Sequence, residues 1–223
     1  MKKIVSVILA ALAFSFCAAA EDVPFSESKS KGNGVILRQG CVLWNKADDG
    51  KIKWVSGKSG NADAGKTFTV SSEATATLVS SSGESKGNFY GIELDGKSYY
   101  VLKSQVWVSD NAKPAIKIRG NVVCRRPLLS SFLEEPALKN LTIGAVDGET
   151  KGNFKVFHYY NTAKYLVETV YIPVDSVSDS KADLEAVELR AKLDATKDAD
   201  LKAKLIDMIN TSACADELKI NWN

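Results

Sequence analysis

A repeated segment constrains the fold of this 223-residue chain more than any other feature of its sequence. Residues 84–89, Glu-Ser-Lys-Gly-Asn-Phe, recur at residues 149–154 as Glu-Thr-Lys-Gly-Asn-Phe. Upstream, residues 36–38 and 117–119 form a second matching pair. The offset between copies is 81 residues for this pair and 65 for the first, so the first copy is 16 residues longer in its middle. A repeat with this order and spacing indicates two similar structural units.

Each copy contains short segments that alternate apolar and polar residues and end at turns. In the first copy, residues 91–94 lead into Asp95-Gly96 and then into residues 98–102. An Asp-Gly pair between alternating segments is typical of a tight β-hairpin, because both central residues of a type I′ turn need a positive φ. In the second copy, residues 154–160 precede a weaker turn at Asn161-Thr162. About five such strands per copy would curl into a small barrel, since a lone hairpin is only marginally stable in water.

These units resemble bacterial Src homology 3 (SH3) domains, which are small barrels of about five strands. The resemblance covers residues 34–110 and 115–177, and it rests on a loop like that at 122–127 and on aromatic hairpin strands like residues 99–101. It implies a mainly β fold, two small SH3-like barrels in tandem plus a C-terminal α-helical segment. The first unit departs from the family pattern, because residues 45–85 are rich in Gly, Ser, Lys and Asp and are expected to form a long hairpin or surface loop.

The N-terminal residues 1–20 have the pattern of a secretory signal peptide. Lys2 and Lys3 precede an apolar run, and the alanines at 18–20 fit the site that signal peptidase cuts. The run is shorter than the roughly 20 residues that a transmembrane helix needs, and no later stretch of the sequence resembles one. We therefore expect an exported protein, periplasmic or otherwise associated with the cell envelope, in which residues 21–33 are a linker.

The cysteines leave several interpretations open. Cleavage would retain Cys41, Cys124 and Cys214, and an odd number leaves at least one thiol unpaired within a monomer. Cys41 and Cys124 lie near the ends of equivalent strands, so a disulfide between them would join the units if their Cα atoms lay within about 7 Å. A free thiol used for dimerisation is the alternative. Cys17 allows a lipoprotein acylated at that residue, although Phe16 is bulky for lipoprotein processing.

Residues 178–223 change character and predict helix. Ser180 followed by Asp183 is a variant of the capping box that begins many helices. Apolar residues then recur at spacings of three and four, but Asp194 and Asp198 interrupt the stripe. The interruption is compatible with two helices that turn near residues 195–197, or with one long helix whose centre is solvated.

A single histidine, His158, restricts the catalytic chemistry of the chain. It excludes a His-Glu-x-x-His zinc site, and the sequence contains no phosphate-binding loop, dinucleotide-binding motif or Gly-x-Ser-x-Gly motif. A cysteine-dependent cell-wall peptidase remains as a remote alternative, which would need a thiol beside His158 and a catalytic domain larger than the helical tail. The sequence therefore predicts no catalytic residues, no metal and no cofactor.

The charge balance and the aromatic residues favour a binding function. Without residues 1–20, basic and acidic residues are equal in number, which is not the charge pattern of a nucleic-acid-binding protein. Outward aromatic side chains on a barrel can form a groove for an extended peptide, and an arginine pair can contact an acidic partner. The candidate ligand-binding residues are Trp44, Trp54, Tyr90, Arg125 and Arg126.

We therefore expect a non-catalytic, exported binding module whose partner is cell-wall peptidoglycan or an envelope protein. The alternative is a structural scaffold or adaptor that uses its C-terminal helices. The sequence leaves the oligomeric state open.

Overall fold

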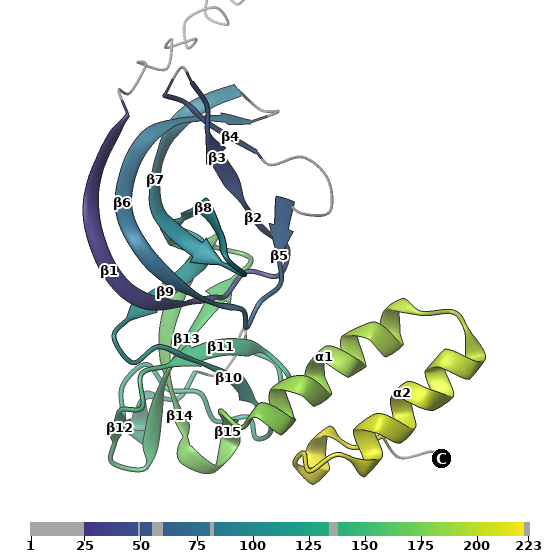
Figure 1. Ribbon diagram of the computed structural model, residues 1–223. Coiled ribbons are helices and arrows are strands. Elements are labelled where there is room, and N and C mark those ends of the chain that lie inside the picture. Colours follow the sequence, from purple (N-terminus) through teal and green to yellow (C-terminus); the bar gives the residue numbers. More distant parts are fainter. Residues whose placement is uncertain (1–24, 49, 55–59, 81–82, 134–137, 221–223) are drawn as a thin grey trace, which may run out of the picture.

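The computed structural model describes residues 25–48, 50–54, 60–80, 83–133 and 138–220 (Figure 1). The predicted signal peptide and Cys17 lie outside these residues. The fold is mainly β with two α-helices, as the sequence predicted. Among the described residues, no helix has both the length and the apolar character that crossing a membrane requires.

The first unit is built around a seven-stranded sheet with the order β4-β3-β8-β7-β6-β1-β9. Its strands are β1 (Ser26–Ile36), β3 (Trp44–Lys46), β4 (Ile52–Trp54), β6 (Thr67–Ser80), β7 (Gly83–Leu94), β8 (Lys97–Leu102) and β9 (Val106–Ser109), with a small separate pair β2 (Cys41–Val42) and β5 (Asn61–Ala62). An additional parallel pairing of β4 with β6 closes five of these strands into a hydrogen-bonded ring. The long strands β1, β6 and β7 bend strongly around this unit (Figure 1).

The second unit is a six-stranded sheet in which β12-β13-β11-β10-β15 lie in that order and β14 pairs with β13. Its strands are β10 (Lys113–Lys117), β11 (Ile143–Val146), β12 (Thr150–Lys151), β13 (Phe154–Asn161), β14 (Leu166–Pro173) and β15 (Val177–Ser178). The path β14-β13-β11-β10-β15 repeats the path β8-β7-β6-β1-β9 of the first unit. The internal sequence repeat therefore corresponds to a repeated strand order.

Equivalent backbone hydrogen bonds support the same conclusion. A one-turn 3-10 helix precedes the last strand of each unit, at Lys103–Gln105 and at Val174–Ser176. Leu37 N donates to Gln105 O at 3.0 Å in the first unit, and Ile118 N donates to Ser176 O at 2.9 Å in the second. Leu37 and Ile118 are equivalent residues of the sequence repeat. In both copies the residue that follows the first long strand or its equivalent is therefore hydrogen-bonded to the 3-10 helix in the same way.

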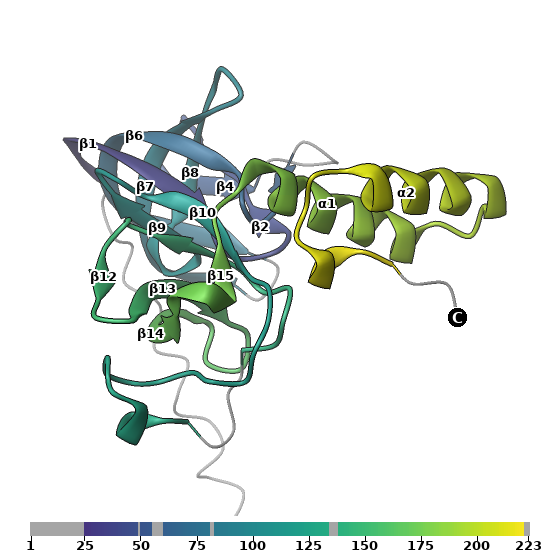
Figure 2. The same cartoon turned by 90° about the horizontal axis from the view of Figure 1, so that it is seen from below.

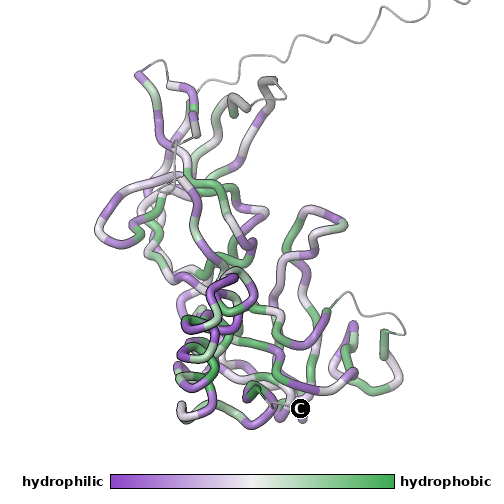
Figure 3. The backbone as a smooth tube through the Cα atoms, turned by 90° about the vertical axis from the view of Figure 1, so that its right-hand side faces the viewer, coloured by the Kyte–Doolittle hydropathy of each residue, from purple (hydrophilic) through white to green (hydrophobic). Residues whose placement is uncertain are grey.

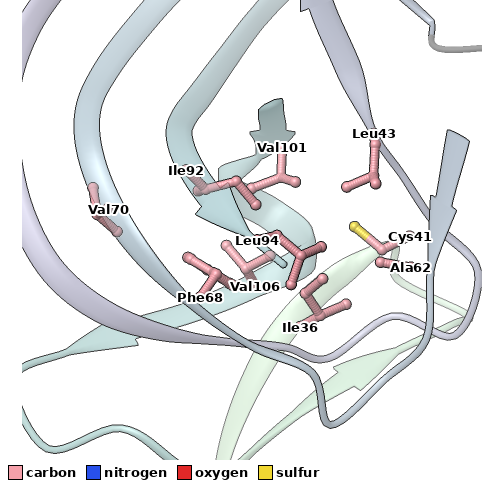
Figure 4. Close-up of a cluster of buried hydrophobic side chains, with 10 residues drawn as sticks. All are labelled: Ile36, Cys41, Leu43, Ala62, Phe68, Val70, Ile92, Leu94, Val101 and Val106. Carbon is pink, nitrogen blue, oxygen red and sulfur yellow. The ribbon is translucent and has the colours of Figure 1, made fainter. Parts of the chain in front are cut away.

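Each unit has its own hydrophobic core, and a smaller cluster joins the two. Figure 4 shows the core of the first unit, which includes Phe68, Ile92 and Val101. The core of the second unit is formed around Phe157 and Ile172. The joining cluster contains Val35, Leu37, Ala112 and Ala145, with Trp107, Tyr160 and Val167 packed against it. In Figure 3, hydrophobic stretches recur within the strands of both units, whereas several connecting segments are hydrophilic.

Two segments differ from the sequence predictions. The expected linker at residues 21–33 is strand from Ser26 onward, because β1 pairs with both β6 and β9. Residues 45–85, expected to form a long hairpin or a surface loop, are not a surface loop: they contain β4, β5 and the 14-residue strand β6, which forms a long hairpin with β7. Alternate residues of β6 are buried, from Phe68 and Val70 through Ala74 and Ala76, which is the period-two pattern of a strand with one face in the core.

The C-terminal segment forms a pair of helices, α1 (Lys181–Ala195) and α2 (Ala199–Thr211), which settles the alternative left open above. Ser180 is the N-cap of α1, and its Oγ accepts from Asp183 N at 3.1 Å, as predicted. Ile209 of α2 and Ala186 of α1 pack with Ile116 of β10 in one buried cluster. The hairpin projects to one side of the two units (Figure 2).

Candidate binding site

Of the three aromatic candidates, Trp44 is buried and Tyr90 is half-buried. Trp44 was predicted to be exposed, but it is only 7% exposed, because β3 lies between β4 and β8 and turns the indole into a core with Ile52 and Phe89. Tyr90 is half-buried, and the Lys103 ammonium lies 4.6 Å from the centroid of its ring. The backbone of Trp54 belongs to β4, and its side chain is outside the described part of the structure.

Arg125 and Arg126, in contrast, lie exposed on a well-defined loop of the second unit. We call residues 124–133 the arginine loop. At its base, Cys124 and Tyr171 exchange two backbone hydrogen bonds of 2.9 Å each. Arg125 N donates to Ser131 O at 3.1 Å, and Ser131 Oγ accepts from Arg126 N at 3.0 Å. The loop is therefore held by its own hydrogen bonds and does not depend on a ligand for its shape.

The arginine loop presents apolar side chains to solvent. Leu128 is 58% exposed, Leu129 68% and Phe132 45%. Together with the two arginines they line an open hollow of about 630 Å³. Within the described part of the chain, neither guanidinium pairs with a carboxylate. The sequence pointed to the arginines but not to these apolar neighbours, although Leu128-Leu129 beside Pro127 in a loop was a visible signal.

The predicted disulfide between Cys41 and Cys124 is wrong, because both cysteines are free and buried. Cys41 lies in the core of the first unit, where its Sγ donates to Gln105 Oε1 at 3.2 Å. Cys124 lies in the second unit between Phe132 and Tyr171. Burial raises the pKa of the Cys41 thiol to about 12, so this thiol is protonated at neutral pH and is a poor nucleophile.

His158 belongs to a buried polar cluster between the units. Its ring stacks on Trp107 with centroids 3.5 Å apart, and its Nδ1 lies 2.9 Å from Thr169 Oγ1. Its Nε2 lies 3.4 Å from Asp147 Oδ2, without the geometry of a hydrogen bond. Asp147 Oδ1 accepts from Trp107 Nε1 at 2.9 Å and from Ser109 Oγ at 2.6 Å. Burial lowers the pKa of His158, and the Asp147 carboxylate opposes that shift.

This arrangement does not bring a thiol to the histidine. The side-chain contacts of His158 within the described residues are with Trp107, Asp147 and Thr169. Cys214 lies elsewhere, in the cluster beneath the helices, where its Sγ donates to Ile209 O at 3.6 Å. The thiol–imidazole pair that a cysteine peptidase needs is therefore not formed by these residues. Among the described residues, no group of three or more metal-ligating side chains is placed to hold a metal ion.

Comparisons with known proteins give little further information. No protein-family model matches the chain, and no curated protein matches it. Two solved structures overlap it: NlpC1 from Trichomonas vaginalis, at 9% identity with a TM-score of 0.22, and NlpC2 from the same organism, at 11% identity with a TM-score of 0.24. Each overlap covers 74% of this chain and 53% or 57% of the other protein, so the chain spans just over half the length of either. At TM-scores this low the overlap supports no conclusion about fold or activity.

Proposed function

We propose that this chain is a non-catalytic, exported binding module with two SH3-like units, and that its arginine loop binds an acidic peptide of the cell wall. Peptidoglycan stem peptides carry carboxylates beside apolar side chains, and such a ligand complements two arginines surrounded by leucine and phenylalanine. The same surface chemistry fits an acidic segment of an envelope protein.

The repeated strand order supports an SH3-like assignment for both units. In the first unit β1 pairs with β6 and β9, and in the second unit β10 pairs with β11 and β15. A 3-10 helix precedes β9 and β15. An SH3-like fold does not by itself determine a ligand; the residues of the binding site do.

The observation that carries the proposal is one loop on which two arginines, with no carboxylate partner among the described residues, lie beside exposed apolar side chains. Leu128, Leu129 and Phe132 would lose contact with water on binding, which favours association. Arg125 and Arg126 can form charge-assisted hydrogen bonds with carboxylates, which are stronger than neutral ones. Because the loop is already ordered, binding would cost little conformational entropy.

Co-sedimentation of residues 21–223 with purified insoluble peptidoglycan tests the proposal. The test variant is Arg125→Ala with Arg126→Ala, and the matched control is Lys202→Ala with Lys204→Ala on α2. Both double variants remove two exposed positive charges. We expect the wild type and the control to pellet with the wall, and the arginine variant to bind about tenfold more weakly, as for a loss near 1.4 kcal/mol.

Phe132→Ser separates the apolar part of the site from the charged part. Phe132 is 45% exposed and belongs to neither core, so its loss should leave the fold intact. It should also weaken sedimentation. If the wild type stays in solution, direct wall binding is wrong. Equal loss of binding in both double variants would show that non-specific charge, and not the arginine loop, holds the protein to the wall.

A second candidate function, a scaffold that recruits a partner through its helices, is supported by two side chains of α2. Leu201 is 45% exposed and Met208 is 53% exposed, two turns apart on the same side of the helix. A chemical crosslinking experiment in the envelope fraction, comparing wild type with Leu201→Gln plus Met208→Gln, tests this function. Crosslinked products that persist unchanged in the variant would contradict it.

A further inference from the structure

A groove separate from the arginine loop lies where the two units meet α1. It consists of two adjoining hollows of about 460 and 370 Å³, both lined by Gln39, Ala64 and Ile143. Gln39 and Ala64 come from the first unit, Ile143 begins β11 of the second, and residues 187–195 of α1 line the far side. We call this the junction groove.

The inner surface of the junction groove is apolar. Leu37 is 4% exposed and Val187 is 8% exposed, and each belongs to a buried cluster. Leu141 and Ile143 pack partly against the cluster that supports the helices. Each hollow lies in the range of about 300–1,000 Å³ that is usual for small-molecule sites, and sites at the contact between domains are common.

Three exposed lysines from three different parts of the chain line the groove, one at the hollow of about 460 Å³ and two at the hollow of about 370 Å³. Lys66 comes from the first unit, Lys139 from the loop before β11, and Lys192 from α1. None of these ammonium groups forms an ion pair within the described residues. An excess of positive charge along a groove attracts an anion.

The acidic residues of the groove offset the charge of these lysines only in part. Asp63 Oδ1 accepts from Gln39 Nε2 at 2.6 Å, and Gln39 Oε1 accepts from Ala64 N at 3.1 Å. This pair of hydrogen bonds fixes the rim of the groove. Glu188 is the other carboxylate that lines it. Three cations therefore face two carboxylates, which leaves an excess of one positive charge on the groove lining.

We propose that the junction groove binds a small amphiphilic anion, with a carboxylate or phosphate head among the three lysines and an apolar body over Leu37 and Ile143. Such a ligand would contact both units and α1 at once, so binding would stabilise their relative arrangement. The site is independent of the arginine loop and of the proposed wall binding.

Isothermal titration of residues 21–223 with octyl phosphate, octanoate and octyl glucoside tests the proposal, with all probes below the concentrations at which they form micelles. The first variant carries Lys66→Gln, Lys139→Gln and Lys192→Gln. Its control carries Lys113→Gln, Lys202→Gln and Lys204→Gln, which removes the same charge from exposed positions outside the groove. The second variant, Ala191→Trp, fills the groove from an exposed position on α1.

We expect the anionic probes to bind the wild type and the control at least about tenfold more tightly than they bind either groove variant, with an affinity that falls as salt is raised. Preference for octyl phosphate or for octanoate would identify the head group. Equal affinity for octyl glucoside, or unchanged affinity in both groove variants, would overturn the proposal. Arg125→Ala with Arg126→Ala should leave this binding intact, so failure here is distinguishable from failure of wall binding.

Discussion

Replacing Asp147 with alanine tests how the two units are held together. Asp147 follows β11 of the second unit, and its Oδ1 accepts from two groups on β9 of the first, Trp107 Nε1 at 2.9 Å and Ser109 Oγ at 2.6 Å. These are the polar counterpart of the apolar cluster that joins the units. Alanine removes the acceptor and leaves both donors facing a space that the carboxylate filled.

The expected loss follows from the strength and the burial of these contacts. A hydrogen bond to a charged group contributes about 1.5–3 kcal/mol, and the Asp147 side chain is 22% exposed, so water can partly replace it. We therefore expect a decrease in the free energy of unfolding of about 2–3 kcal/mol. For a chain of this size, each kcal/mol corresponds to about 2–4 °C in Tm.

Guanidinium chloride unfolding followed by tryptophan fluorescence measures this loss, and near-UV circular dichroism reports on the stacked rings of Trp107 and His158. The matched control is Asp175→Ala, because Asp175 is 68% exposed and lies 3.4 Å from Arg119, a contact of the kind that contributes about 0–1 kcal/mol. If Asp147→Ala lowers the free energy of unfolding no more than Asp175→Ala, and the near-UV spectrum is unchanged, the polar cluster does not hold the two units together.

Three further predictions concern single buried groups. Burial lowers the pKa of His158 below its usual 6.5, so the unfolded chain binds the proton first as the pH falls. The free energy of unfolding should therefore decrease from pH 6.5 downward. In denaturant titrations between pH 7 and 5, His158→Phe should flatten that dependence. Because Cys41 is buried and its pKa is raised to about 12, it should react with a thiol reagent at pH 8 only after unfolding, as mass spectrometry of the labelled peptide would show. Asp183 is 5% exposed and accepts from Ala215 N at 2.6 Å, so Asp183→Ala should lower the free energy of unfolding by about 2–3 kcal/mol. The control Glu185→Ala, at an exposed position, should change it by less than about 0.5 kcal/mol. Equal effects of the two variants in thermal unfolding would contradict the stabilising role of Asp183.

Local signals in the sequence were sufficient for turns and caps. The hairpin predicted at Asp95-Gly96 is confirmed, with φ of 50° and 74° at these residues, because few residue pairs accept positive φ in succession. The second hairpin was only partly right. Its turn is longer than Asn161-Thr162, since β14 begins at Leu166 and Tyr165 has a φ of 57°. Asn161 Oδ1 holds this turn by accepting from the backbone N–H groups of residues 163 and 164.

Which face of a strand is buried depends on neighbouring strands that the sequence does not specify. Alternation predicts that half of the aromatic residues face inward, but it does not say which half. Trp44 is inward because β3 lies between β4 and β8. The possible disulfide is not formed for a related reason, since Cys41 is buried in the first unit and Cys124 is buried in the second. On α2, Leu201 and Met208 are exposed although they lie on the same apolar stripe as buried Leu205.

The length of β6 was not predicted because most of its buried residues beyond Phe68 and Val70 are small or hydroxylated. Ser72, Ala74 and Ala76 of β6 are buried, and Gly34 of β1 leaves room for the ring of Phe68. A Cβ at residue 34 would lie 2.2 Å from that ring, so the glycine is required by the close approach of these two strands. Composition rich in Gly and Ser suggests a loop, but here it permits tight packing between long, bent strands.

The two copies differ most informatively at the end of their first strands. Ile36 and Lys117 are equivalent, and their backbones bond alike: Gly65 N donates to Ile36 O at 2.8 Å, and Leu141 N donates to Lys117 O at 2.7 Å. Gly65 and Leu141 both have a positive φ, at 88° and 68°. The backbone frame is thus conserved between the units, even where leucine has to adopt a conformation that favours glycine.

The side chains at this position have opposite character. Ile36 fills the core of the first unit, whereas Lys117 is 1% exposed and its Nζ donates to Gly120 O and Asn140 Oδ1. Burial lowers the pKa of Lys117, and removing an amine from water is costly unless its hydrogen bonds are made. Gly120 and Asn140 lie at the two ends of the segment that contains the arginine loop, so Lys117 links these ends through hydrogen bonds. The equivalent Ile36 can make no such hydrogen bonds. The copies have therefore diverged where the loop with Arg125 is anchored, which favours the second unit as the one that presents a ligand-binding loop.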